Sequence, residues 1–476
     1  MIFLRNFFSM SAMRIISAGL TFGLVVAFSR LEGMAQLGQF SLLITLFLFF
    51  QLLPLLGLHL YLIREISAAP QSIAHHLPNA SVLALFVSVF LALGLGFGGA
   101  EIYADMPEIH PALWLVALSL IPTAPISAIE AGLLAQQRMD AVAIRNVAEN
   151  ILRSSLSLWL LLSGHGLTSI FIVFFCGRVL TAISYLTMDS LPSVMNFREI
   201  SRTTLCSYIR KIPVFFGIAL LGALSTRLDM LIMSKLSTPE QLGLYAAAYK
   251  LYELGLMVPQ IISVVIFPHM SALHAQSSTA MARLLTPVIT YSVLGATPLL
   301  ILLGYNAEWV MSLFGSQAAT GAPVLKLLLP ALISAGCGQL LAVSMLVLNR
   351  SDLDLRTLAV GTVFTAALLI FVIPRWGATG AAVAMLVLSI LIFALRFFLL
   401  RSLMSLSRSL KSLIKSMLPG VVMIMTMVVA PGTLNIFEVM GLGLVNYLLS
   451  AKLFGLLTLA PIREISALVQ ANEGKS

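Results

Sequence analysis

Apolar runs of about 20 residues follow one another along nearly the whole chain, and only short polar segments separate them. A run of this length crosses the hydrocarbon core of a bilayer as an α-helix, because a helix satisfies its own backbone hydrogen bonds. Only 10% of the 476 residues are charged, whereas soluble domains carry about 25%, and the mean hydropathy is +1.01. The sequence therefore predicts an all-α polytopic membrane protein.

Fourteen spans are expected when hydropathy is averaged over about 19 residues. Six lie near residues 10–28, 38–63, 78–97, 112–135, 145–163 and 167–188. Six more lie near 212–235, 241–267, 284–304, 322–348, 355–374 and 378–400, and the last two lie near 414–430 and 434–457. They divide the chain into an N-terminal six-helix lobe (1–200), a C-terminal six-helix lobe (201–405) and two extra helices with a cytoplasmic tail (406–476).

Two short strings recur at matching places in the two halves. Residues 36–40 (QLGQF) and 241–245 (QLGLY) each lie between the first span of a half and the next. Residues 137–140 (QRMD) and 349–352 (NRSD) each follow the fourth span. Because each half has an even number of spans, both start on the same side of the membrane, and a pseudo-two-fold axis along the membrane normal would relate the lobes. Two lobes that rock about a site at their interface are typical of a secondary transporter.

Lys and Arg residues are distributed unevenly between the two sides of the predicted membrane. If the N-terminus is cytoplasmic, only Arg30, Lys235 and Arg375 lie in external segments, whereas most of the 28 basic residues lie in internal ones. This excess agrees with the positive-inside rule and predicts that both termini are cytoplasmic. The net charge of +9 therefore reflects topology, and no binding of nucleic acid is expected.

Arg178 is the clearest of the basic residues that fall inside spans, where a charge costs at least about 2.5 to 3.5 kcal/mol. It lies roughly 16 Å into its span at about 1.5 Å per residue, which is the midplane and too deep for snorkelling. Two interpretations are open. Arg178 either faces a hydrated cavity that receives an anion or pairs with a glutamate elsewhere in the chain.

Arg145, Glu149 and Arg153 recur at four-residue spacing and therefore share one helix face. A stripe that neutralises itself at the cytoplasmic entrance of the helix is expected for Arg145. Arg153 lies deeper, so the structural and the substrate-binding roles are both open.

The second half begins with four more candidates on two adjacent spans. Lys250 and Glu253 are three residues apart and can meet on one face, whereas Arg227 and Asp229 point to different faces and need partners from other helices. Glu130, in the fourth span, is either a proton or cation site or the partner of an intramembrane arginine.

These residues form two sets of candidates. The expected substrate-binding residues are Arg178, Arg153, Arg227, Lys250 and Arg14, and the residues expected for ion coupling are Glu130, Asp229 and Glu253. The deep cations outnumber the deep acids, so the expected cavity is net positive.

No motif for catalysis, a metal or a cofactor is expected. Residues 94–99 (GLGFGG) match a dinucleotide fingerprint, but no strand precedes them. Close helix packing at Gly94 and Gly98 is the expected reason for these glycines.

Several segments resemble the polysaccharide exporters, or O-antigen-type flippases, of the multidrug/oligosaccharidyl-lipid/polysaccharide (MOP) exporter superfamily. The resemblance is carried by residues 227–231 (RLDML), 241–250 (QLGLYAAAYK), 258–259 (VP), 267–268 (FP) and 377–382 (GATGAA). One departure is Met233, where the family's helix has leucine.

The resemblance implies a flippase of a bacterial inner membrane. It would translocate an undecaprenyl-diphosphate-linked oligosaccharide from the cytoplasmic to the outer leaflet by alternating access, without ATP or a cofactor. A polysaccharide polymerase and chain-length proteins would be its partners. The alternatives are a cation-coupled multidrug exporter of the same superfamily and a noncatalytic scaffold for polysaccharide assembly. The basic intramembrane residues fit an anionic cargo better than a cationic drug.

Overall fold

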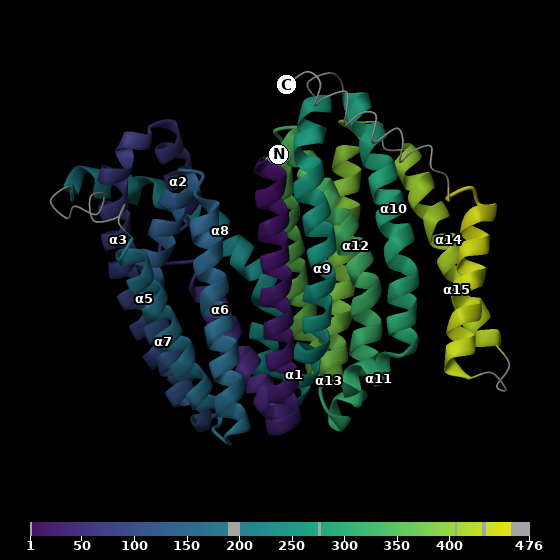
Figure 1. The fold of residues 1–476 in the computed structure, drawn as a ribbon, viewed down its shortest axis with the longest axis horizontal. Coiled ribbons are helices and arrows are strands. Elements are labelled where there is room, and N and C mark those ends of the chain that lie inside the picture. The colour runs from purple at the N-terminus through teal and green to yellow at the C-terminus, as the bar shows by residue number, and fades with distance from the viewer. Residues whose placement is uncertain (1, 189–199, 275–277, 405–406, 431–434, 458–476) are drawn as a thin grey trace. The chain divides into compact units, whose positions relative to one another are not determined.

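The computed structural model describes residues 2–188, 200–274, 278–404, 407–430 and 435–457, and within these ranges every regular element is a helix (Figure 1). The chain forms two compact units, Met1–Ala247 with Phe314–Gln317, and Ala248–Leu313 with Ala318–Ser476. The division falls inside one helix. The lobe boundaries at residues 200 and 405 follow from internal similarity and stay a prediction.

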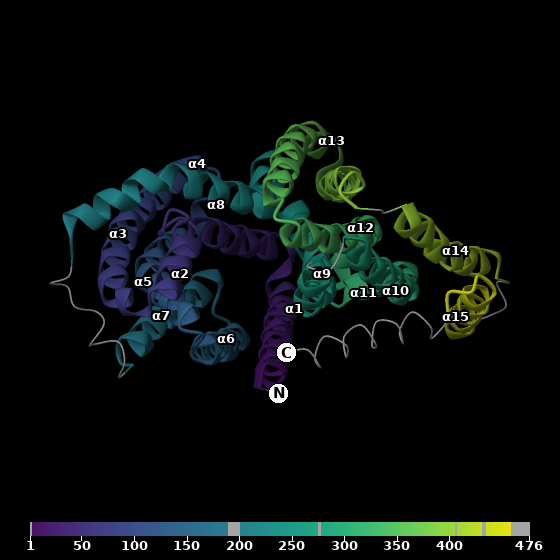
Figure 2. The ribbon, with the colours of Figure 1, turned by 90° about the horizontal axis from the view of Figure 1, so that it is seen from above.

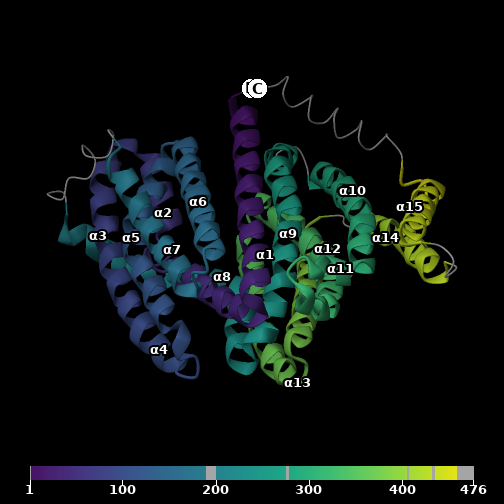
Figure 3. The ribbon, with the colours of Figure 1, turned by 60° about the horizontal axis from the view of Figure 1, so that its bottom comes forward.

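The first unit is built around helices with small side chains on their contact faces. Its elements are α1 (Ile2–Phe50), α2 (His59–Ala68), α3 (Ile73–Leu93), α4 (Gly99–Ile102), α5 (His110–Ala135), α6 (Met139–Leu162), α7 (Leu167–Leu186), α8 (Arg202–Leu236) and the start of α9 (Pro239–His274). In α5, Ala117, Ala124 and Ala131 are fully buried, and α3 and α7 pack on either side of this helix (Figure 3). Small residues let membrane helices approach closely, so α5 is the centre of this unit.

The second unit contains the rest of α9, then α10 (Ser278–Tyr305), α11 (Ala307–Ser312), α12 (Ala322–Val347), α13 (Ser351–Leu400), α14 (Ser407–Val429) and α15 (Ile436–Leu453). Helix α12 packs along α13, and α14 and α15 lie side by side as a hairpin against α10 (Figure 1). Met270, Leu285 and Leu341 are fully buried where α9, α10 and α12 meet.

The expected number of spans agrees with the structure once two long helices are divided. Among the described residues, eleven helices are long and apolar enough to cross a membrane. Both α1 and α13 contain a kink, at Gly33 (φ 86°) and Gly377 (φ 52°), where only glycine adopts the backbone without strain. Figure 2 shows the two arms of α1 running in different directions. Counting each arm separately, and adding the more polar α6, gives fourteen segments.

The second expected span, residues 38–63, is not one continuous helix. Helix α1 ends at Phe50 and α2 begins at His59, and the turn between them contains Leu56 and Gly57 at positive φ. A Cβ on Gly57 would lie 2.1 Å from the carbonyl oxygen of Phe215 in α8. The break therefore lets α8 pass closely, which hydropathy alone does not reveal.

The glycine string at residues 94–99 packs closely, as expected, but through a different glycine. Residues Gly94–Gly98 form a π-helical turn, and the nearest described atoms leave open space at both Gly94 and Gly98. Gly96 is the packed position, because a Cβ there would lie 2.4 Å from the ring of Trp114 in α5. The prediction of close packing was right for the string but wrong for the two glycines named.

The repeated strings meet each other inside the first unit. A Cβ on Gly38 would lie 2.0 Å from the carbonyl oxygen of Pro239, and a Cβ on Gly243 would lie 1.9 Å from that of Met34. Gly38 thus faces the carbonyl of the residue four positions before Gly243, and Gly243 faces the carbonyl of the residue four positions before Gly38. The second arm of α1 and the first turns of α9 cross at this contact, which no larger residue would permit.

Candidate functional site

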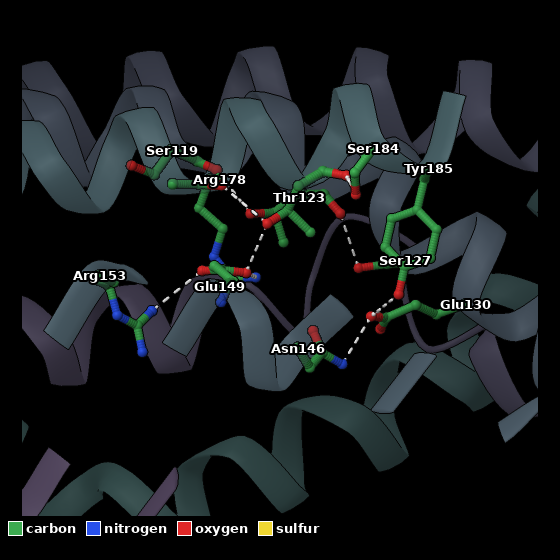
Figure 4. Close-up of polar contacts among 12 residues, drawn as sticks. Ser119, Thr123, Ser127, Glu130, Asn146, Glu149, Arg153, Arg178, Ser184 and Tyr185 are labelled. Atoms are coloured by element: carbon green, nitrogen blue, oxygen red, sulfur yellow. Dashed lines mark hydrogen bonds and ion pairs between the residues drawn. The ribbon is translucent and has the colours of Figure 1, made fainter. Parts of the chain in front are cut away.

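Polar side chains gather between α6 and α7 in the first unit. The Glu149 cluster consists of Glu149 and Arg153 from α6 and Arg178 and Thr181 from α7 (Figure 4). Only 5% of the Glu149 side chain is exposed, compared with 15% for Arg178 and 21% for Arg153. The acid is therefore the most deeply buried charge of the group.

Glu149 bridges the two arginines. Its Oε1 accepts a hydrogen bond from Nη1 of Arg153 at 3.2 Å, and its Oε2 accepts one from Nη1 of Arg178 at 3.4 Å. The hydroxyl of Thr181 donates to the same Oε2 at 3.0 Å and shares its hydrogen with the carbonyl of Gly177 at 2.9 Å. Each arginine therefore uses one nitrogen, and neither forms the paired fork contact that guanidinium groups make with a carboxylate.

Local sequence explains how the cluster forms. Four-residue spacing puts Glu149 and Arg153 on one face of α6, and it also aligns Gly177 with Thr181 on α7. A Cβ on Gly177 would lie at ordinary contact distance, 3.8 Å, from Cγ of Glu149, so this residue faces the acid directly. Aromatic rings cover the cations: Arg178 lies over Phe47 at 5.0 Å, and Arg153 lies over Phe174 at 5.1 Å.

Within the four residues of the cluster the charges do not balance, and the neighbouring Glu130 is a second acid that interacts electrostatically with Arg178. One carboxylate serves two guanidinium groups, and within the described part of the chain Nε of Arg178 is buried without a hydrogen-bond partner. The structure gives Arg178 a glutamate partner, Glu149, which is the second of the two interpretations left open by the sequence. This contact uses one nitrogen of Arg178 and leaves its buried Nε as a donor for an anion.

Arg145 does not belong to the cluster. It donates to the carbonyl oxygens of Ala141 at 3.1 Å and Ser184 at 3.4 Å, and it lies over the ring of Tyr185. The expected neutralisation of Arg145 by Glu149 is therefore wrong, because Glu149 turns toward the two deeper arginines.

Glu130 forms a second polar group beside the cluster (Figure 4). Its Oε1 accepts hydrogen bonds from the hydroxyl of Tyr185 at 3.0 Å and the amide of Asn146 at 3.1 Å. Both hydrogen bonds come from neutral groups, and Arg178 interacts with Glu130 electrostatically without a direct contact. The proposed ion-coupling role of Glu130 stays a prediction.

Asp229 has a partner on another helix, as its two-residue spacing from Arg227 predicted. The hydroxyl of Tyr245, fully buried in α9, donates to Oδ2 of Asp229 at 2.5 Å, and the backbone N–H of Met230 donates to Oδ1 at 2.8 Å. Arg227 interacts with Asp229 electrostatically. Tyr245 is the last residue of the repeated string QLGLY, so one function of that string is to hold Asp229.

Two ion pairs of the second unit bear on the expected site. Lys250 donates to Glu253 at 3.0 Å, as their spacing predicted. Arg396 of α13 is only 7% exposed and donates to Oδ1 of Asp354 at 2.8 Å and to the carbonyl oxygen of Gly338 at 3.0 Å. Sequence reasoning does not find this pair, because the two residues are 42 positions apart and only the fold brings them together.

Arg14, the remaining candidate, lies in α1, but its side chain is outside the described residues. Among the residues that the structure describes, no three His, Cys, Asp or Glu side chains gather as a metal site requires.

Comparison with solved structures identifies the class of the fold. The inward closed conformation of the lipid II flippase MurJ matches with a TM-score of 0.71 and 16% identity, over 94% of this chain and 98% of that chain. An inward-facing multidrug resistance MATE family transporter of the MOP superfamily matches with a TM-score of 0.66 and 14% identity, over 81% and 93%. A MOP superfamily transporter from Pyrococcus furiosus matches with a TM-score of 0.57 and 13% identity, over 84% and 95%. The fold is therefore the two-lobe fold of the MOP transporters, as expected.

The family follows from the sequence. The model of the polysaccharide biosynthesis protein family matches residues 3–274, which is more than half of the chain. The chain belongs to this family, and the resemblance to polysaccharide exporters of the MOP superfamily is confirmed. A comparison with curated proteins finds no sequence match.

Proposed function

We propose that the protein is a flippase for an undecaprenyl-diphosphate-linked oligosaccharide, which it moves from the cytoplasmic to the outer leaflet by alternating access without ATP. The observation that supports this best is the excess of guanidinium over carboxylate in the Glu149 cluster. The family and the similarity to a lipid II flippase agree with a lipid-linked cargo.

The physical barrier to this cargo lies in its headgroup. A diphosphate and its sugars lose their water when they cross a bilayer, at a cost that blocks unaided passage. Arg178 and Arg153 would replace that water, because the planar guanidinium offers paired donors to phosphate oxygens. An inside-negative potential favours outward movement of each negative charge by about 2.3 kcal/mol per 100 mV, so the membrane potential can drive the step.

The residues assigned to this role are Arg178 and Arg153, with Arg227, Lys250 and Arg14 as further candidates for the substrate path. Glu130, Asp229 and Glu253 are the candidates for proton or sodium coupling. The site is proposed to work in a bacterial inner membrane, with both termini cytoplasmic and with a polysaccharide polymerase and chain-length proteins as neighbours.

Transport in liposomes tests the proposal. Purified protein should move a fluorescent polyprenyl-diphosphate sugar between leaflets without ATP, and ethidium should not compete. A multidrug exporter would instead extrude ethidium and ignore the lipid-linked sugar. A scaffold would move neither compound, so the three functions give different results.

A further inference from the structure

The contacts of Glu149 are poorly suited to a permanent ion pair. Charge-assisted hydrogen bonds are typically about 2.7 to 2.9 Å long, whereas Glu149 holds Arg153 at 3.2 Å and Arg178 at 3.4 Å. The pair of Arg396 with Asp354 measures 2.8 Å and shows what a close pair looks like in this chain. Glu149 is therefore stretched between two cations that it does not fully satisfy.

The donors left over by Glu149 point to an anion with more acceptors. A guanidinium has five N–H donors, and Nε of Arg178 has no partner among the described residues. A carboxylate has two oxygens, and here each one reaches a different arginine (Figure 4). A diphosphate carries more oxygens than a carboxylate, so it can engage both arginines through several nitrogens each.

An empty site nevertheless needs an acid at this place. Two largely buried guanidinium groups without a counter-charge would be destabilising, since the cost of removing one partner of a buried pair is large. Glu149 prevents this while the site is empty. Once a diphosphate has arrived, the same carboxylate would repel it.

We infer that Glu149 is an internal counter-anion, which occupies the place of the substrate's diphosphate between Arg153 and Arg178 and is displaced from the arginines when the diphosphate binds. This inference rests on the proposed function. Thr181 holds Glu149 in the empty state through its hydroxyl, so it opposes the exchange. Arg153, the more exposed arginine, is where the incoming headgroup makes first contact.

Binding of a fluorescent short-chain polyprenyl-diphosphate sugar to the full-length protein in detergent tests the exchange. Glu149→Gln keeps the shape and removes the competing charge, so it should bind the probe at least about tenfold more tightly than the wild type. Thr181→Val keeps the volume and releases Glu149, so it should tighten binding about threefold. Asp354→Asn is the matched control, because it also removes a carboxylate from a buried arginine, and its folded fraction should bind like the wild type.

The outcomes separate this inference from the function on which it rests. If the wild type binds the probe and Arg178→Ala does not, but Glu149→Gln and Thr181→Val bind no more tightly than the wild type, the exchange is wrong and the flippase proposal stands. If the wild type does not bind the probe, both fail. Should Glu149→Gln fail to fold, the affinity of Thr181→Val decides alone. If Asp354→Asn binds the probe as tightly as Glu149→Gln does, the loss of a carboxylate from any arginine raises the affinity. That result would also overturn the inference.

Discussion

Buried arginines have different partners in the two units. In the second unit, Arg396 has an acid of its own at 2.8 Å and a backbone carbonyl at 3.0 Å. In the first unit, Arg178 shares Glu149 with Arg153 at longer distances and keeps a buried nitrogen without a partner among the described residues. An arginine with its own acid and a backbone carbonyl holds helices together, whereas one with a buried, unpartnered nitrogen retains the capacity to bind. The same residue type therefore has a structural role in one unit and a proposed ligand role in the other.

The largest expected effect is on stability, at Arg396. Replacing it by alanine leaves Asp354 and the Gly338 carbonyl without their donor, which should cost about 3 to 5 kcal/mol. Thermal unfolding of the purified protein in detergent measures this loss. Protein that stays folded should transport normally, and an Arg396→Ala variant with wild-type stability but no transport would remove the contrast between the units.

At Arg178 the expected effect is on transport. Arg178→Ala should lower the flipping rate about 100-fold, since charge-assisted contacts to the headgroup are lost, while the protein still inserts and folds. Arg178→Lys should recover only part of the rate because the paired donors are missing. The contrast between Arg178 and Arg396 is wrong if Arg178→Ala moves the lipid-linked sugar at the normal rate, or if it loses as much stability as Arg396→Ala does.

A smaller effect on transport is expected at Arg153, the other arginine of the cluster. Its side chain is more exposed than that of Arg178, and Glu149 keeps Arg178 as a partner when Arg153 is removed. We expect Arg153→Ala to reduce the flipping rate about tenfold and to leave the unfolding temperature nearly unchanged. A loss as large as that of Arg178→Ala would show that the two arginines act as one unit.

The smallest expected effect on stability is at an exposed ion pair. Lys235 donates to Asp105 at 3.0 Å and holds the pKa of that carboxyl below its ordinary value. The contribution to stability is thus present above the unfolded pKa of about 3.9 and is lost as the pH falls through the lower folded pKa. Because Asp105 is 63% exposed, Asp105→Asn should cost less than about 0.5 kcal/mol near neutral pH and nothing in acid. The unfolding temperatures of the wild type and of Asp105→Asn, each measured near neutral pH and in acid, check this. A larger loss of stability would mean that the exposure of an ion pair does not predict its contribution.

Hydropathy and spacing predicted much of the fold. Most of the helical segments could be predicted because a span must be apolar over the thickness of a bilayer. The pairing of Lys250 with Glu253 could be predicted because both stand on one helix, where spacing fixes the distance. The break after Phe50 could not, since it depends on how closely α8 passes Gly57.

The site was predicted only in part, for a related reason. Periodicity shows which residues share a face of α6, but it does not show which face of α7 lies opposite. Arg178 was recognised from its depth alone, whereas Glu149 was assigned to Arg145, one turn away on its own helix. The missing information was that Arg178 faces Glu149, and only the packing of α6 on α7 supplies it.

The contact between Gly38 and Gly243 has a consequence for the origin of the chain. In a symmetric dimer the interface is isologous, which means that each subunit meets on its partner the same surface that it presents. The two copies of the repeated string meet in this way within one polypeptide, because each glycine faces the carbonyl four residues before the other. The contact within this one chain therefore has the reciprocal form of a two-fold homodimer interface. Duplication and fusion of a six-span ancestor would leave such a contact.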